Sequence, residues 1–131
     1  MDPGGRQKRR DWREGEGMGA PAARHRADEL SVDRLARESR RYAGSCGTSE
    51  RAAGAGLRPA FRDRDTGEVF LARFADGRPA PLHILDGLPA RYVTRRDARG
   101  CVLAVTAAIE AGFVDALGFF LTRAEAAARY R

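Results

Sequence analysis

Aspartate and glycine recur close together through the second half of the chain. These recurring turn sequences limit the length of any helix or strand between them. Five glycines follow an aspartate by one to three residues, namely Gly67, Gly77, Gly87, Gly100 and Gly118. The first three are spaced ten residues apart. Aspartate followed by glycine is typical of tight turns, because glycine adopts the left-handed conformation that such turns require. From Leu57 onward the sequence therefore predicts short antiparallel strands joined by tight turns.

The segments between these turns carry the alternation of half-buried strands. In the segment LRPAFRD, apolar residues alternate with Arg58 and Arg62, which places the two arginines on one face of a strand. Between Cys101 and Phe113 every second residue is apolar or small, as in one long bent strand or two shorter ones. Residues 107–117 also fit a helical period. A glycine in the middle of such a helix costs about 1 kcal/mol, which favours the strand.

The end of the chain predicts a helix. Thr122 and Glu125 have the spacing of a capping box, and the alanine-rich sequence that follows has a high helix propensity. Residues 57–131 therefore predict an α+β domain, a small antiparallel β-meander of four to six short strands closed by a C-terminal helix. A domain of this size buries only about 60% of its unfolded surface, so a partner or a second copy would add stability.

The first 56 residues differ in character from the rest. Residues 1–28 predict a disordered, basic, Arg/Gly-rich tail, because apolar residues never recur there at a fixed period. Ser31–Tyr42 carries a thin apolar stripe at helical spacing, so residues 29–56 predict one marginal helix followed by a small-residue linker at 44–56. Alternatively, part of this region lies upstream of the true start.

The net charge of +6 and the isoelectric point near 10.3 raise nucleic acid as a partner. Residues 1–56 and 57–131 each hold twelve basic and nine acidic residues, so neither half concentrates the charge. Of the 24 basic residues 23 are arginines, a usage that GC-rich codons also produce.

The sequence contains no apolar run long enough to span a membrane and no secretory signal pattern, which predicts a cytoplasmic protein without membrane contact. Cys46 lies in a Gly/Ser-rich segment and Cys101 in an apolar one, and we expect two unpaired thiols.

The sequence FADGRPAPLHILDGLP, residues 74–89, holds three prolines and one of the two histidines. Proline has no N–H, so Pro79 and Pro81 would leave one edge of a strand without donors. This predicts a blocked edge strand in which the apolar residues at 80, 82 and 84 face the core and His83 lies at the surface or its rim.

His83 is a weak candidate for a catalytic base, oriented by Asp86 or near Asp76. Both aspartates precede a glycine and are explained by turns alone, and no serine or second histidine lies within residues 57–131 to complete a triad. The cysteines and histidines lack metal-ligand spacing, and no phosphate-binding glycine motif is present. The sequence therefore predicts no metal site and no cofactor.

Nucleic-acid binding is the alternative function. Arg58 and Arg62 share one strand face and Arg91 and Arg95 share another, and nearby aromatic rings offer surfaces on which bases stack. Solvated arginines and buried rings explain the same pattern.

Phe119 and Phe120 are adjacent in a short strand, so one of them points away from the core face. In a domain this small an outward phenylalanine suits contact with a partner, and residues 113–130 predict a compact dimerisation or docking corner.

The segments PAFRDRDTGEVFLARFADGRPAPLHILDGLP and GFVDALGFFLTRAEAA, within about residues 57–130, resemble short bacterial proteins of uncharacterised families. The resemblance implies no activity, cofactor or catalytic residue. We expect a small noncatalytic interaction or accessory module that binds a protein partner or itself. A nucleic-acid-associated regulator is the second hypothesis, and an enzyme centred on His83 is the third.

Overall fold

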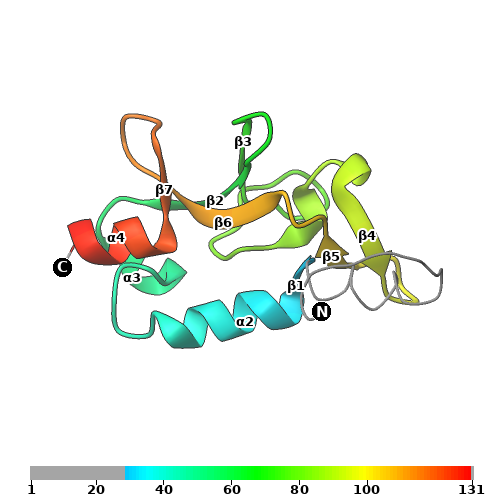
Figure 1. Ribbon diagram of the computed structural model, residues 1–131, viewed down its shortest axis with the longest axis horizontal. Helices are drawn as coiled ribbons and strands as arrows, with labels where there is room; N and C mark the ends of the chain where they lie inside the picture. The colour runs from blue at the N-terminus through cyan, green and yellow to red at the C-terminus, as the bar shows by residue number, and fades with distance from the viewer. Residues whose placement is uncertain (1–28, 131) are drawn as a thin grey trace, which may run out of the picture.

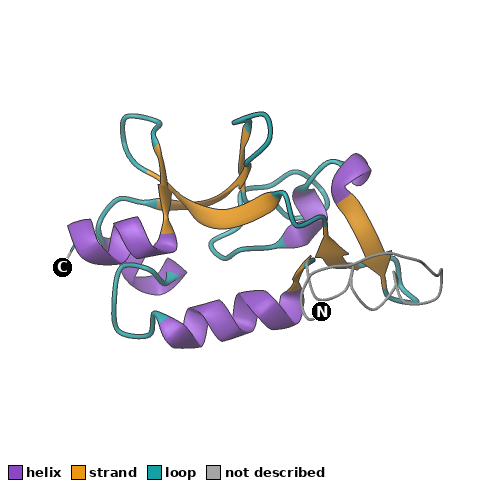
Figure 2. Ribbon diagram, in the orientation of Figure 1, coloured by secondary structure: helices purple, strands orange, loops and turns teal. Residues whose placement is uncertain are grey.

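The computed structural model describes residues 29–130, which form two antiparallel sheets and three α-helices (Figure 1). The α+β class and the closing C-terminal helix are confirmed. The tail expected at residues 1–28 lies outside the described residues. Figure 2 shows two hairpin loops at the top of the molecule and the longest helix along the bottom.

The larger sheet has four strands in the order β3-β2-β6-β7. Their bounds are Arg58–Asp63 for β2, Val69–Leu71 for β3, Ile109–Val114 for β6 and Phe120–Thr122 for β7. Phe61 lies opposite both Phe70 and Ala111, and Phe113 lies opposite both Pro59 and Leu121. Because directly opposed residues share a face, these apolar residues form the core face of the sheet.

The smaller sheet has three strands in the order β1-β5-β4. Their bounds are Leu30–Ser31 for β1, Val93–Arg96 for β4 and Val102–Val105 for β5. Two short 3-10 helices, η2 (Leu85–Gly87) and η3 (Ala90–Tyr92), precede β4. This sheet therefore joins a strand from residues 30–31 to a hairpin from the second half of the chain.

Two of the three helices have the caps that the sequence favours. The first helix, α2 (Val32–Arg41), begins where the Ser31 hydroxyl accepts a hydrogen bond from the Arg34 amide at 3.1 Å. The last helix, α4 (Arg123–Arg129), begins with the expected capping box of Thr122 and Glu125. Figure 1 shows α2 running below the larger sheet, with α4 and the short helix α3 (Ser49–Gly54) at one end.

Packing begins well before residue 57, where we expected the domain to start. Leu30 and Leu35 belong to the same buried cluster as Phe61 and Ile109. Ala52, from the segment expected to be a linker, is fully buried in a second cluster with Phe113, Leu57, Leu121 and Ala126. The prediction of a linker at 44–56 was wrong because small residues there let α3 approach the sheet closely.

The aspartate-glycine turns form as expected at 97–100 and 115–118. Gly100 and Gly118 have φ angles of 90° and 91°, in the left-handed region. In the second turn the carboxylate of Asp115 accepts hydrogen bonds from the amides of Leu117 (2.9 Å) and Phe119 (3.0 Å). These bonds fix the turn from within, so the hairpin tip has a defined shape.

The expected edge strand around Pro79 and Pro81 is absent, and the chain there is a loop with a single bridge between Arg73 and Pro79. The two prolines remove the donors that a second ladder bond would need. Without a ladder the alternation of faces is lost, so Leu82 is 55% exposed and Leu85 is buried.

Residues 109–114 form strand β6, as the glycine argument favoured. Gly112 lies opposite Ala60 on one neighbouring strand and Thr122 on the other. A Cβ atom at this position would overlap the carbonyl oxygen of Leu121 and the ring of Phe120. The ring of Phe120 therefore occupies the space that a side chain at residue 112 would fill.

No helix within residues 29–130 combines the length and the apolar character needed to cross a membrane.

Replacing Gly112 tests this close packing. We expect Gly112→Ala to lower the free energy of unfolding by about 2 kcal/mol, because β7 must shift to relieve the overlap. Gly54→Ala is the matched control, since no atom lies within 4 Å of its added Cβ, and it should leave stability unchanged or raise it by up to about 1 kcal/mol. Urea unfolding of both variants measures the difference. Equal effects would show that β7 does not pack against Gly112.

Candidate functional site

His83 is half-buried and lines a cleft of the fold. Its ring makes edge-on contacts with Phe61 and Phe113, at centroid distances of 5.4 and 5.2 Å. Its Nε2 lies 2.7 Å from the carbonyl oxygen of Gly112. A carbonyl oxygen only accepts hydrogen bonds, so the proton resides on Nε2 and Nδ1 is an acceptor. The edge strand from which its position was predicted does not form, and loop residues bring the ring against the sheet at the cleft.

Arg123 provides the donor that faces His83. This side chain is 4% exposed, and its Nη2 donates to Nδ1 of His83 at 3.1 Å. Its Nη1 donates to the carbonyl oxygen of Gly47 at 2.8 Å. Its Nε lies 3.3 Å from Oε1 of Glu38, an ion pair without hydrogen-bond geometry. Burial lowers the pKa of Arg123, and the charge of Glu38 opposes that shift.

Ser49 reaches the same imidazole from helix α3. Its hydroxyl oxygen lies 3.4 Å from Nδ1 of His83, at the edge of a cleft of about 470 Å³. The cleft has apolar walls from Leu35 and Leu82, with Arg123 among its polar groups. A serine hydroxyl beside an imidazole resembles the arrangement that activates a nucleophile.

The electrostatics of the cleft disfavour that chemistry. Burial and, to a lesser extent, the charge of Arg123 together lower the pKa of His83 to about 3, against the opposing effect of its backbone hydrogen bonds. An imidazole with this pKa holds a proton far too weakly to take one from a hydroxyl near neutral pH. Nδ1 is also occupied by the Arg123 donor. The arrangement is suited to holding Arg123 in place.

Neither aspartate considered as a partner contacts His83. Asp86 accepts a hydrogen bond from the amide of Val102 at 2.7 Å and so anchors β5. Asp76 pairs with Arg78 at 2.7 Å in an exposed turn. The hypothesis of an aspartate-oriented base is therefore not supported by any contact in the described residues.

Sequence reasoning missed three residues of this cluster, namely Ser49 beside His83, Glu38 paired with Arg123, and Arg123 itself. The first two lie in the region that was assigned outside the domain. The third is the first residue of α4 and is buried like Ala126, and its sequence neighbours Thr122 and Ala124 give no signal of that burial.

Three of the four candidate nucleic-acid arginines are engaged with glutamates. Arg62 donates to Glu110 through Nε (2.9 Å) and Nη2 (2.7 Å). Arg91 lies 3.2 Å from Glu68, and Arg95 lies 2.9 Å from Glu29. Each ion pair neutralises positive charge that the binding of a phosphate backbone would require.

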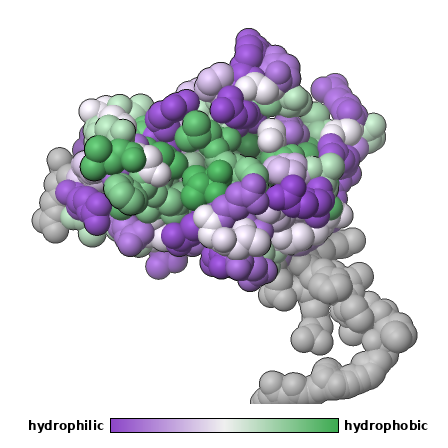
Figure 3. Space-filling model, turned by 90° about the horizontal axis from the view of Figure 1, so that it is seen from above, coloured by the Kyte–Doolittle hydropathy of each residue, from purple (hydrophilic) through white to green (hydrophobic). Residues whose placement is uncertain are grey.

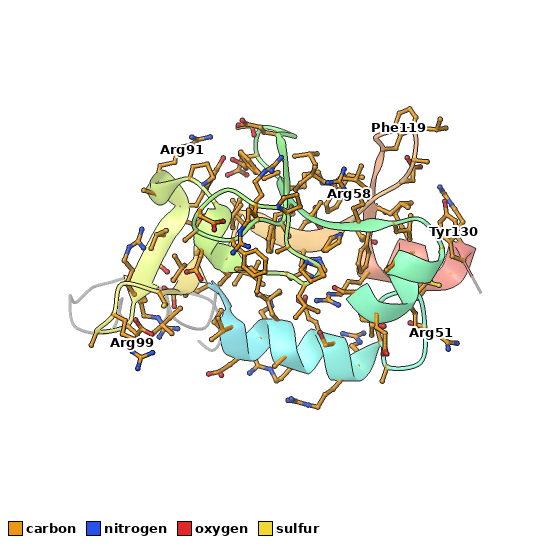
Figure 4. All side chains as sticks on the ribbon, turned by 180° about the vertical axis from the view of Figure 1, so that it is seen from behind. Arg51, Arg58, Arg91, Arg99, Phe119 and Tyr130 are labelled. Carbon is orange, nitrogen blue, oxygen red and sulfur yellow. The ribbon has the colours of Figure 1, made fainter. Side chains whose placement is uncertain are left out.

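Arg58 is exposed and has no ion pair within residues 29–130. Figure 4 shows it far from Arg91, so the candidate arginines do not form one surface. The rings of Phe70 and Tyr92 contact each other at 5.6 Å within the fold and offer no stacking platform.

The adjacent phenylalanines point in different directions. Phe120 is half-buried over Gly112, with the guanidinium of Arg62 4.6 Å from its ring centroid. Phe119 is 66% exposed and Leu117 is 82% exposed, both in the β6–β7 hairpin. Figure 4 shows Phe119 at the outer tip of that hairpin, directed away from the fold.

A second cleft, of about 320 Å³, is almost wholly apolar. Alanine, leucine and proline side chains line it, from α3, β2, β3 and residues 79–81. Arg58 is its one charged lining residue among those described. Seen from above, the molecule carries a broad apolar patch bordered by polar residues (Figure 3).

The described residues hold no cluster of three histidine, cysteine, aspartate or glutamate side chains placed to bind a metal ion. Cys46 is buried and Cys101 is exposed, and both are unpaired as expected.

A comparison with protein-family models finds no match to the chain, and comparisons with curated proteins and with solved structures find none either. The function of the chain therefore has to rest on its own geometry.

The pH dependence of stability tests the neutral state of His83. Above pH 6.5 the imidazole of His83 is neutral in both the folded and the unfolded protein. Below it the unfolded imidazole gains a proton, whereas the folded one stays neutral down to about pH 3. Stability is therefore lost as the pH falls through this window, by at most about 1.4 kcal/mol per pH unit. His83→Gln should remove this component.

Urea unfolding of both proteins between pH 7 and pH 4 measures the two slopes, and the carboxylates common to both cancel in the difference. Parallel slopes would mean that His83 titrates normally in the folded protein.

Proposed function

We propose that the chain is a small noncatalytic interaction module, and that the partner is a second copy of itself. The observation that carries this proposal is the pair of large apolar side chains at the tip of the β6–β7 hairpin. Leu117 and Phe119 are the two most exposed large hydrophobic residues in the described part of the chain. Exposed clusters of this kind mark interaction sites more often than chance positions do.

The hairpin is suited to binding because its shape is set in advance. The carboxylate of Asp115 holds the amides of both Leu117 and Phe119. Binding therefore requires little ordering of the tip, which reduces the entropic penalty of association. Aromatic side chains, phenylalanine included, are also enriched at the cores of protein interfaces.

The apolar cleft beside Arg58 has the properties of a receptor for that tip. Its volume of about 320 Å³ accommodates a phenyl ring, and its lining is alanine, leucine and proline apart from the arginine. Asp115 lies next to the apolar tip, so the hairpin of one copy would bring a carboxylate to the arginine at the cleft of the other. Opposite charges in these places favour one orientation of docking.

Each copy carries one hairpin and one cleft. A two-fold pair would therefore make both contacts at once and leave neither tip exposed. The domain gains from such a pair because its own core is small and split into two clusters.

The other two hypotheses receive less support. A nucleic-acid surface would need the positive charge of Arg62, Arg91 and Arg95. Each of these arginines forms an ion pair with a glutamate, which neutralises that charge. An enzyme centred on His83 would need a base whose proton affinity is not suppressed by burial and by Arg123. We place the module in the cytoplasm, since an exposed unpaired thiol at Cys101 suits a reducing compartment.

Replacing the hairpin tip tests the proposal. The wild-type chain should show a concentration-dependent dimer by light scattering coupled to size exclusion. Phe119→Asp should weaken the dimer at least about tenfold, because a desolvated charge replaces an aromatic anchor. Arg58→Glu should also weaken it, through repulsion of Asp115.

Leu82→Asp is the matched control, since Leu82 is 55% exposed and lines the larger cleft beside Ser49 but not the apolar cleft or the tip. It should leave the dimer unchanged. A monomer at every concentration, or equal effects of Phe119→Asp and Leu82→Asp, would contradict self-association.

A further inference from the structure

A third, smaller cleft lies between α2, β6 and the start of α4. Its volume is about 200 Å³, and its wall on the α4 side is Arg123. Four arginines and two glutamates contribute to its lining, namely Arg34, Arg41, Arg64, Arg123, Glu38 and Glu110. The lining of this cleft therefore holds more arginines than glutamates. These residues come from elements that are distant in sequence.

The two carboxylates are already shared among arginines. Glu38 contacts Arg34 at 3.5 Å and Arg123 at 3.3 Å. Glu110 receives both donors of Arg62 from the strand beside it. Neither glutamate therefore has the capacity to neutralise the remaining arginines of the cleft.

Arg41 and Arg64 have no carboxylate partner within residues 29–130. The guanidinium of Arg41 lies 5.7 Å from the ring centroid of Tyr42, and Nη2 of Arg64 donates to the carbonyl oxygen of Ala107. A ring face and a backbone carbonyl attract a cation more weakly than a carboxylate does.

Arg123 is the buried cation of the cleft. It is 4% exposed, and its Nε forms an ion pair with Glu38 at 3.3 Å without hydrogen-bond geometry. Its other two nitrogens are fixed by Gly47 and His83, so the guanidinium does not rotate toward a better acceptor. A phosphoryl group in the cleft would add negative charge beside this buried guanidinium.

We propose that this cleft binds a phosphoryl group, as inorganic phosphate or as the head of a small phosphomonoester. A tetrahedral phosphoryl group offers acceptor oxygens in several directions, which suits a cleft whose arginines come from different elements. A volume of about 200 Å³ holds such a group and is smaller than typical pockets for whole cofactors or drug-sized ligands. The proposal is independent of self-association through the hairpin.

Calorimetric titration of the full chain at low ionic strength tests this site. Inorganic phosphate and glycerol 3-phosphate are the two probes, and sodium chloride of equal ionic strength is the blank. Saturable binding of at least one probe is expected. Arg41→Gln should weaken it by roughly 10-fold or more, the effect of losing one charge-assisted hydrogen bond.

Arg37→Gln is the matched control. It removes the same charge from the same helix, but Arg37 is exposed and does not line the cleft. It should change the affinity less than about twofold, as expected for a screened surface charge. Circular dichroism confirms that both variants fold.

Three results would overturn the proposal. The first is the absence of saturable binding with both probes. The second is an equal loss of affinity in Arg37→Gln and Arg41→Gln, which would mean attraction by net charge alone. The third is binding of a single-stranded oligonucleotide that depends on Arg41 while neither small probe binds, which would assign the cleft to a phosphodiester backbone.

Discussion

The buried guanidinium of Arg123 is the interaction on which the rest of the structure depends. A charge this deeply enclosed is stable only where acceptors surround it. Gly47 and His83 supply acceptors from a turn and a loop, and Glu38 adds an ion pair from helix α2. All three are distant in sequence from α4. One side chain thus holds three separate segments against the start of the C-terminal helix, and its geometry dictates where each of them lies.

The need of Arg123 for acceptors explains why His83 is neutral and why the two clefts that Arg123 lines differ in chemistry. Only a neutral imidazole with its proton on Nε2 accepts from Arg123, and the enclosure by Phe61 and Phe113 maintains that state by excluding water. Arg123 also lines both the larger cleft beside Ser49 and the smaller arginine-rich cleft. The side that faces His83 is satisfied, whereas the side that faces Glu38 lacks an acceptor. Binding of an anion is therefore favoured on the side of Arg123 that faces Glu38. Proton transfer is disfavoured on the side that faces His83.

The parts of the fold that depend on local sequence were predictable. Four of the five glycines after aspartates have the left-handed backbone of a turn, and the exception, Gly87, lies in η2. Thr122 capped the last helix, and alternation placed β2 and β6 correctly. The contacts of His83 were not predictable, because its partners lie 34, 40 and 29 residues away at Ser49, Arg123 and Gly112. Small residues at 44–56 suggested a linker, since their composition fits both a flexible chain and a helix packed closely against a sheet. Composition alone does not separate these cases.

The exposure of Phe119 follows from the absence of a side chain at Gly112. Gly112 leaves a space on the outer face of the sheet, and the ring of Phe120 fills it beneath Arg62. Successive residues of a strand point to opposite sides, so Phe119 is turned away from that space. The turn ordered by Asp115 then carries it beyond the core face, next to Leu117. The apolar tip is therefore a consequence of how Gly112 is packed, and the tip persists for as long as that packing does.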